Sequence, residues 1–299
     1  MAEPPWIWRW ANLQPLMDQA IAVAGLEAAE RRVLTLANPG FKDSVRTSTN
    51  LNAGIQVLKP GEIARPHRHS ANALRFVIEG TGAITKVDNK VCEMLPGDLI
   101  LTPGWTWHEH EHKGTVRMAW LDVLDVPLFD YLKINFFEPG PTHNVSEPIA
   151  DAAFATSGLL PQVNASEHSP IFRYPWPAAN AAIENVPPAT DGSRLLRYVN
   201  PVTGGPVMAL IDCSLLRLAP HAATHRRRVS GNTICLVAEG EGESAIGDQT
   251  IAWKKHDIFT LPHWNWISHK ASGAGATLFQ VSDDQVLRRL GLWREEIAA

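Results

Sequence analysis

Two distant stretches of this chain repeat one another, and the repeat constrains the fold more than any other feature. The segment VIEGTGAITKVD at 77–88 parallels VAEGEGESAIGD at 237–248. Further along, LPGDLILTPGWTWHEH at 95–110 parallels KKHDIFTLPHWNWISH at 254–269. Each copy consists of short apolar segments separated by turn residues, which is typical of strands in a sandwich or closed barrel. We therefore expect two copies of one β-domain in the 299-residue chain.

The repeat divides the chain into five parts. We expect an N-terminal arm and helix over 1–50, a first barrel over 51–126, and a second barrel over 191–285. The segment 127–190 is rich in Pro, Ala, Asn and Ser, and it reads as an ordered connection with short helical pieces near 149–155 and 178–184. The pattern over 286–299 predicts a short C-terminal amphipathic helix.

Two patterns mark the N-terminal arm. Trp6, Trp8 and Trp10 alternate, which favours an edge segment that packs its indoles on the body of the protein. Apolar residues then recur at helical spacing, with Asn12 as the expected N-cap and Gly25 as the expected end.

Composition excludes several classes of protein. The net charge is −4, which gives no electrostatic footprint for nucleic acid. We expect no membrane partner, because the opening residues lack a signal-peptide core and no apolar run reaches the length of a membrane span. The cysteines are odd in number and not at zinc-site spacing, so we expect no disulfides and a cytoplasmic location: Cys92, Cys213 and Cys235.

Five of the twelve histidines lie between Gly61 and His112. His67 and His69 form an H-x-H pair, and on a strand such residues point to the same face. If the strand that holds His108 is a neighbour, a third imidazole reaches the same point, and neutral imidazole suits Fe, Zn, Cu or Ni. The alternative is three satisfied core histidines. His112, at the end of the run, is expected at the surface.

The second repeat helps to decide between these readings. Alignment of the two copies places Arg227, Val229 and Ile267 at the positions of the three candidate ligands. Only His269, which matches His110, keeps its histidine. Because the second copy folds without the ligands, we interpret them as a metal site and expect one metal per chain, in the first barrel.

The two motifs around these histidines resemble those of a known superfamily. The pattern from Gly61 to Gly80 resembles the first motif of the cupins, and that from Gly97 to His108 resembles the second. The usual glutamate of the first motif is absent at Ala73 or Leu74. With HRHSANALRFVIEG and TPGWTWHEH, the chain is similar to the gentisate 1,2-dioxygenase family, which includes salicylate and 1-hydroxy-2-naphthoate dioxygenases. ERRVLTLANPG, RYVNPVTGG and SDDQVLRRLGL extend the resemblance over most of the chain.

The resemblance implies an all-β bicupin, with two double-stranded β-helix (jelly-roll) barrels and short peripheral helices. It implies Fe(II), one per chain, held by His67, His69 and His108. The implied reaction is extradiol-type cleavage of gentisate or a substituted salicylate by O2, between the carboxyl-bearing and hydroxyl-bearing ring carbons. It also implies a homo-oligomer, a tetramer or dimer. The alternatives are a cupin metalloenzyme of other chemistry and a non-catalytic bicupin that binds small carboxylates.

Two further residues are candidates for catalysis. Arg75 lies six residues beyond His69, on the same face of an unbroken strand, where its guanidinium could bind a carboxylate. Its alternative is an ion pair with a core acid such as Asp122. His110 shares a face with His108 and could orient or protonate the substrate; its alternative is a scaffold role.

The remaining candidates contact the substrate or support the site. Gln56, on the strand that leads in, could hydrogen-bond the substrate carboxylate. Asp122 is similar to an acid that supports the site in the family. Either Arg31 or Arg32 could reach the carboxylate, and Trp105 could form a wall of the ring pocket.

Overall fold

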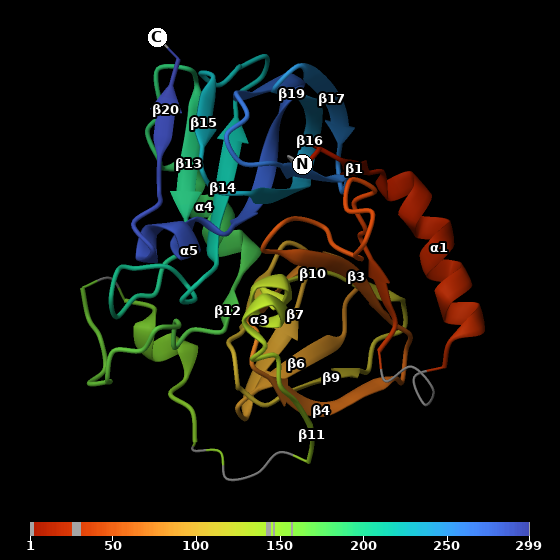
Figure 1. Cartoon of the computed structure of the whole chain (residues 1–299). Helices are drawn as coiled ribbons and strands as arrows, with labels where there is room; N and C mark the ends of the chain where they lie inside the picture. The colour runs from red at the N-terminus through yellow and green to blue at the C-terminus, as the bar shows by residue number, and fades with distance from the viewer. Residues whose placement is uncertain (1–2, 26–30, 142–144, 146, 157, 299) are drawn as a thin grey trace.

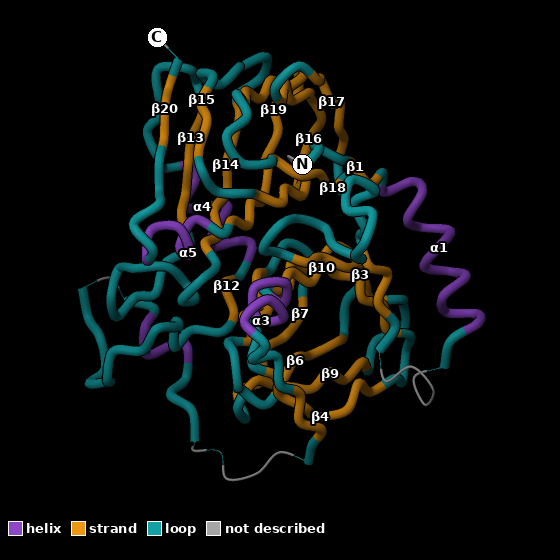
Figure 2. Tube along the Cα trace, viewed as in Figure 1, coloured by secondary structure: helices purple, strands orange, loops and turns teal. Residues whose placement is uncertain are grey.

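The computed structural model describes residues 3–25, 31–141, 145, 147–156 and 158–298. Two β-barrels are stacked on one another, and helix α1 (Trp10–Val23) lies along one flank (Figures 1 and 2). Among the described residues, no helix combines the length and the hydropathy of a membrane span.

The first barrel consists of two facing antiparallel sheets. The six-stranded sheet has the order β12 (Arg173–Tyr174), β8 (Leu99–Thr102), β5 (Ala73–Glu79), β10 (Met118–Leu124), β3 (Asn52–Leu58) and β2 (Val33–Thr35). The five-stranded sheet has the order β11 (Phe137–Pro139), β4 (Ile63–His69), β9 (His108–His112), β6 (Ala83–Val87) and β7 (Lys90–Met94). Burial alternates along β7 and β9, as expected for strands with one face toward the barrel interior.

The second barrel repeats this plan within one nine-stranded sheet, because two long strands run through both of its faces. The long strands are β16 (Thr233–Ile246) and β19 (Ile267–Ser282). The other members are β13 (Ser193–Arg197), β14 (Asp212–Leu218), β15 (Arg227–Val229), β17 (Gln249–Lys254), β18 (Ile258–Leu261), β1 (Ile7–Trp8) and β20 (Glu295–Ile297). The structure thus has the bicupin architecture that the repeat predicts.

The two barrels share a core at their contact. Phe76 of β5 stacks on Phe279 of β19, with ring centroids 4.2 Å apart. Burial of apolar surface from both barrels in one cluster stabilises their mutual orientation. The strands at this contact, β3, β5 and β10, are therefore buried almost throughout.

An aspartate at the same position in each barrel caps a helix. Asp98 accepts the backbone N–H of Trp176, at the start of α4 (Trp176–Glu184), at 2.8 Å. Asp257 accepts that of Trp10, at the start of α1, also at 2.8 Å. The prediction of Asn12 as the N-cap is therefore wrong: the helix begins earlier, because its cap comes from the second barrel.

The arm and the connection agree with the sequence patterns in outline. Strand β1 pairs with β18 at the edge of the second barrel; Trp10 is buried there, whereas Trp6 is 42% exposed. The helical pieces expected in the connection are the 3₁₀ turn η1 (Asp151–Phe154) and α4. The connection also holds α3 (Val126–Leu132).

The predicted C-terminal helix over 286–299 is wrong beyond Arg289. Helix α5 (Asp284–Arg289) is short, and the chain turns at Gly291, whose φ is +71°. It then continues as β20, which pairs with β15. The unpaired edge of β15 decides this outcome, since it offers the terminal segment a hydrogen-bonding partner.

Candidate metal centre

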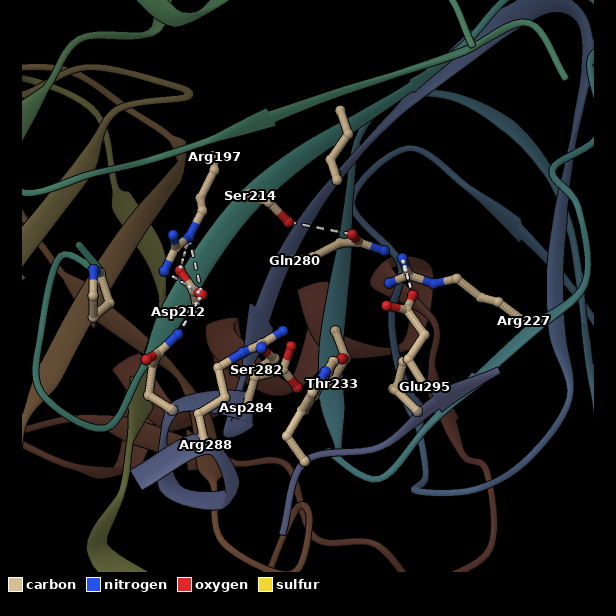
Figure 3. A pocket seen from close by; sticks show the side chains of 15 residues that line it. Arg197, Asp212, Ser214, Arg227, Thr233, Gln280, Ser282, Asp284, Arg288 and Glu295 are labelled. Carbon is tan, nitrogen blue, oxygen red and sulfur yellow. Dashed lines mark hydrogen bonds and ion pairs between the residues drawn. The ribbon is translucent and has the colours of Figure 1, made fainter. Parts of the chain in front are cut away.

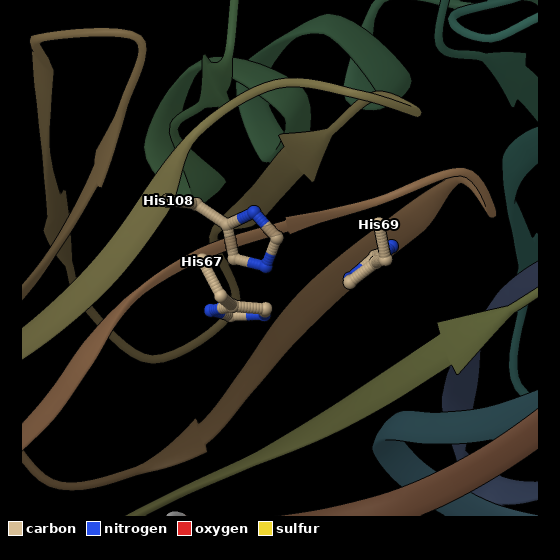
Figure 4. A group of neighbouring side chains, drawn as sticks. All are labelled: His67, His69 and His108. Atoms are coloured by element: carbon tan, nitrogen blue, oxygen red, sulfur yellow. The ribbon is translucent and has the colours of Figure 1, made fainter. Parts of the chain in front are cut away.

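Strands β4 and β9 bring three histidines to one point (Figure 4). His67 and His69 lie two residues apart on β4, and His108 on β9 is the cross-strand partner of His67. One ligand atom from each ring lies within 4.8 Å of the others. This is the one such cluster in the part of the chain that the structure describes. The predicted meeting of the three imidazoles is therefore confirmed.

Hydrogen bonds orient two of these rings for metal binding. The Nδ1 of His69 lies 2.8 Å from the carbonyl of Ala71, and the Nδ1 of His108 lies 3.0 Å from that of Thr106. A carbonyl can only accept, so each Nδ1 carries the proton and each Nε2 keeps its lone pair. The Nε2 of His108 is buried and has no partner among the described residues. A buried acceptor of this kind fits a bound metal ion.

The electrostatics keep the imidazoles neutral. Burial lowers the pKa of His69 to about 4 and that of His108 well below its usual range. Burial also lowers the pKa of His67 to about 2, and the charge of Arg31 adds to this shift. Neutral imidazole is the form that binds metals.

Arg31 lies at the site and Arg32 does not. The Arg31 guanidinium contacts the Nδ1 of His67. Arg32 forms a buried ion pair with Glu62, with the Nη1 donating to Oε2 at 3.0 Å. Of the two arginines that the sequence left open, Arg31 is therefore the one that lines the cavity, and its contact with a substrate stays a prediction.

Arg75 fits both of its predicted readings. Its Nε lies 3.2 Å from Oδ1 of Asp122, its cross-strand neighbour, and its Nη1 donates to Thr102 at 3.1 Å. Burial raises the pKa of Asp122, and the charge of Arg75 opposes that shift. The Nε and Oδ1 atoms are at ion-pair distance without hydrogen-bond alignment. Both residues also line the cavity in front of the histidines.

That cavity has a volume of about 360 Å³. Gln56 lies in its wall, and the Nε2 of this side chain is buried with no partner among the described residues. Pockets of this size suit a small ligand held by a few polar groups on apolar walls. The lining includes Arg31, Val33, Asn52, Gly54, Gln56, His67, His69, Ala73, Arg75, His108, Asp122, Leu124 and Phe137.

His110 lies behind His108 in the barrel interior, outside this lining. Its Nδ1 is 2.9 Å from the hydroxyl of Thr85. His269 makes the same contact in the second barrel, with the hydroxyl of Ser244 at 2.7 Å. This equivalence supports the scaffold reading, while a catalytic role for His110 stays a prediction.

Two predictions about neighbouring residues are wrong. Trp105 is 45% exposed and lines a different pocket, and its ring packs under the guanidinium of Arg68, 4.5 Å from the ring centroid. His112 is buried, and its Nε2–H donates to the carbonyl of Val116 at 2.6 Å. It shares the inward face of β9 with His108, so the strand period could have indicated its burial.

The sequence did not single out Phe137 as a site residue. It belongs to β11, in the connection between the barrels, and its ring stacks on His67 with centroids 5.3 Å apart. No periodic pattern marks this segment. Its position depends on the pairing of β11 with β4.

Comparisons with known proteins agree with this geometry. Residues 54–124 match the family described as "Cupin domain". A gentisate 1,2-dioxygenase from Aquipseudomonas alcaligenes is 35% identical over 97% of this chain and 86% of its own length. A 1-hydroxy-2-naphthoate 1,2-dioxygenase from a Nocardioides species is also 35% identical, over 98% of this chain and 78% of its own.

A solved structure of salicylate 1,2-dioxygenase from Pseudaminobacter salicylatoxidans is 35% identical and superimposes with a TM-score of 0.92. The match covers 99% of this chain and 88% of that one. The fold, the histidine cluster and these relatives lead to one conclusion. The chain belongs to the gentisate 1,2-dioxygenase family of bicupin ring-cleaving dioxygenases.

Proposed function

We propose that this enzyme uses Fe(II) and O2 to cleave the ring of gentisate or a related substituted salicylate between the carboxyl-bearing and hydroxyl-bearing carbons. One observation carries the proposal: the three-histidine cluster opens into a cavity that also holds Arg31, Gln56 and Arg75. Such a cavity places a candidate metal-binding site beside hydrogen-bond donors that suit a carboxylate.

His67, His69 and His108 would hold the iron through one ring nitrogen each. When bound, Fe(II) supplies a chelation point for the hydroxy-acid substrate and a means of activating dioxygen. A ligand set without negative charge suits a substrate that brings its own. This charge balance favours a salicylate-type anion over a neutral phenol.

The chain's own residues would bind and orient that anion. Arg31 and Gln56 present N–H donors to the cavity, and a guanidinium can bind a carboxylate through two parallel hydrogen bonds. Arg75 supplies a fixed positive charge, held in place by Asp122. Val33, Leu124 and Phe137 would pack on the ring and exclude water.

Oxygen uptake by the iron-loaded enzyme tests the proposal. A panel of gentisate, salicylate, halosalicylates, nitrosalicylates and hydroxynaphthoates should include at least one substrate that gives uptake and a ring-opened product absorbing in the near ultraviolet. No uptake with any member of the panel would contradict the assignment.

Arg31→Gln tests the binding role within the same assay. We expect the KM to rise roughly 10-fold to 100-fold, which is the range for loss of a charged hydrogen-bonding partner. Arg32→Gln is the matched control, because that side chain pairs with Glu62 away from the cavity. A larger rise in KM for Arg32→Gln than for Arg31→Gln would contradict the assignment of Arg31 to substrate binding.

The dimer or tetramer and the cytoplasmic location stay predictions. Three exposed apolar side chains near α3 support self-association: Tyr131, Leu132 and Phe136. Sedimentation analysis would measure the number of subunits directly.

A further inference from the structure

The second barrel has a cavity at the place where the first barrel has its metal pocket. The strand registers establish the equivalence: Arg227 pairs with Ile267 across β15 and β19, as His67 pairs with His108 across β4 and β9. Gln280 pairs with Cys235 as Asp122 pairs with Arg75. Arg227 therefore stands where the first barrel has a metal ligand.

This cavity has two connected parts. The inner part has a volume of about 270 Å³, and Asp191 and His225 are among its polar lining residues. Six aliphatic side chains supply most of its apolar wall: Leu195, Leu216, Val229, Leu261, Ile267 and Ile297. The outer part has a volume of about 630 Å³ and is more polar (Figure 3). Arg227, Thr233, Gln280 and Glu295 line both parts, so these polar side chains lie at the junction.

Arg227 has free hydrogen-bonding capacity at this junction. Its one ion pair among the described residues is with Glu295, at 3.6 Å, which is longer than a hydrogen bond. Its side chain is 51% exposed. A guanidinium carries five N–H donors, so one loose contact leaves most of them available to a ligand.

His269 adds a second donor to the inner part. Its Nδ1 contacts the hydroxyl of Ser244 at 2.7 Å, and that hydroxyl accepts the indole N–H of Trp253 at 2.8 Å. The hydroxyl's own hydrogen can then go to Nδ1, which leaves the ring proton on Nε2. Burial, together with the charge of Arg227, lowers the pKa of His269 to about 3, so the ring is neutral.

The outer part contains equal numbers of arginines and carboxyl groups, and Arg197 is already paired with Asp212 at 2.8 Å. Its three arginines, Arg197, Arg227 and Arg288, face the carboxyl groups of Asp212, Asp284 and Glu295. Burial, together with the neighbouring Asp283 and Asp212 carboxylates, raises the pKa of Asp284 to about 7. The guanidinium of Arg227, with its single loose contact, is therefore the group at the junction that is most available to an anion.

We propose that this cavity binds a small monocarboxylate with an apolar body about the size of one ring, independently of the metal pocket. The carboxylate pairs with Arg227 and accepts the Nε2–H of His269, and the apolar body fills the inner part. In the first barrel a metal ion would supply the positive charge at this point. In the second barrel the guanidinium supplies it, so no metal is required.

Titration of 4-fluorobenzoate, followed by fluorine NMR, tests the proposal in the full-length enzyme. The wild-type protein and His108→Ala should bind the probe equally at the second barrel. Arg227→Gln should weaken binding roughly 10-fold to 100-fold, through loss of a charged partner. Benzylamine, which has a similar ring and the opposite charge, should bind at least tenfold more weakly than the carboxylate.

Glu295→Gln is the matched variant, and its expected effect on probe affinity is opposite to that of Arg227→Gln. It removes the carboxylate that competes for Arg227, so it should tighten probe binding, and it decides the question if Arg227→Gln does not fold. Unchanged affinity in both variants would overturn the proposal. Loss of binding in His108→Ala would also overturn it, by placing the probe in the metal pocket, as would tighter binding of benzylamine.

Discussion

The two barrels have the same strand framework, called the frame below, and different side chains in their interiors. In the first, Asn72 donates its backbone and side-chain N–H groups to Asp125, each at 2.7 Å. In the second, Asn232 donates the same two groups to Asp283, at 2.7 and 2.8 Å. These bonds tie a strand start to a strand end in each barrel, so the frame is fixed by the same contacts twice.

The interiors differ at the corresponding positions. Three histidines in the first barrel become an arginine, a valine and an isoleucine in the second. The buried Arg75–Asp122 ion pair becomes the neutral pair of Cys235 and Gln280, whose amide lies 3.8 Å from the sulfur. The second barrel folds without the histidines and the ion pair. The strand framework therefore requires neither the histidines nor the ion pair. Their presence in the first barrel is explained by the candidate metal site.

The largest expected effect is on the metal. His108→Ala removes one of three ligands, so iron content should fall toward zero and activity by more than roughly 100-fold, since residues that merely support ligands already cost 10-fold to 100-fold. Elemental analysis and oxygen uptake would measure both. Ile267→Val is the control at the matching position and should keep its iron; stoichiometric iron in His108→Ala would break the comparison.

Introducing the three histidines into the second barrel would test whether the strand framework alone positions metal ligands. The triple variant Arg227→His, Val229→His and Ile267→His recreates the first barrel's set at the same strand registers. We expect the metal-to-protein ratio to rise from about one to about two, because neutral imidazoles at these positions converge on one point. A ratio that stays at one would show that the two frames differ more than their registers indicate.

Loss of the Arg75–Asp122 ion pair should lower the free energy of unfolding more than loss of the neutral Cys235–Gln280 contact. Asp122→Asn leaves the buried cation of Arg75 without its partner, which should lower the free energy of unfolding by about 3–5 kcal/mol. Gln280→Ala, at the matching position, should cost about 1 kcal/mol. Chemical denaturation of both variants would measure the difference. Equal costs would mean that the charge of Arg75 is balanced elsewhere.

The smallest expected effect concerns Asp284. This residue follows Asp283 in the second barrel, as Val126 follows Asp125 in the first. Its pKa is raised to about 7 in the folded protein, so the folded state binds a proton more tightly than the unfolded state. Stability should therefore fall as pH rises from about 4 to 7. Asp284→Asn should be about 1 kcal/mol more stable than wild type at pH 8.

Thermal melts at pH 8 and pH 4.5 would test this dependence. The advantage of Asp284→Asn should shrink toward zero at the lower pH, where the carboxyl is protonated in the folded state. The exposed Asp248→Asn is the control and should change the melting temperature little at either pH. An advantage that grows toward low pH would contradict the raised pKa.

The sequence by itself determined the repeated β-domain and the meeting of three histidines at one point. Both depend on local periods: the alternation of side chains on a strand places His67 and His69 on one face, and the repeat shows which positions the frame can vary. The same alternation places His112 on the inward face of its strand, whereas we expected this residue at the surface. These inferences need no knowledge of how distant segments pack.

Only the tertiary structure decided which residues surround the histidine cluster and where the helices begin. Arg31 contacts His67 whereas Arg32 pairs with Glu62, and Phe137 reaches His67 through the pairing of β11 with β4. The cap of α1 comes from Asp257, far along the chain. The physical reason is the same in each case: a local pattern sets the direction of a side chain, whereas its partner is set by packing between segments distant in sequence.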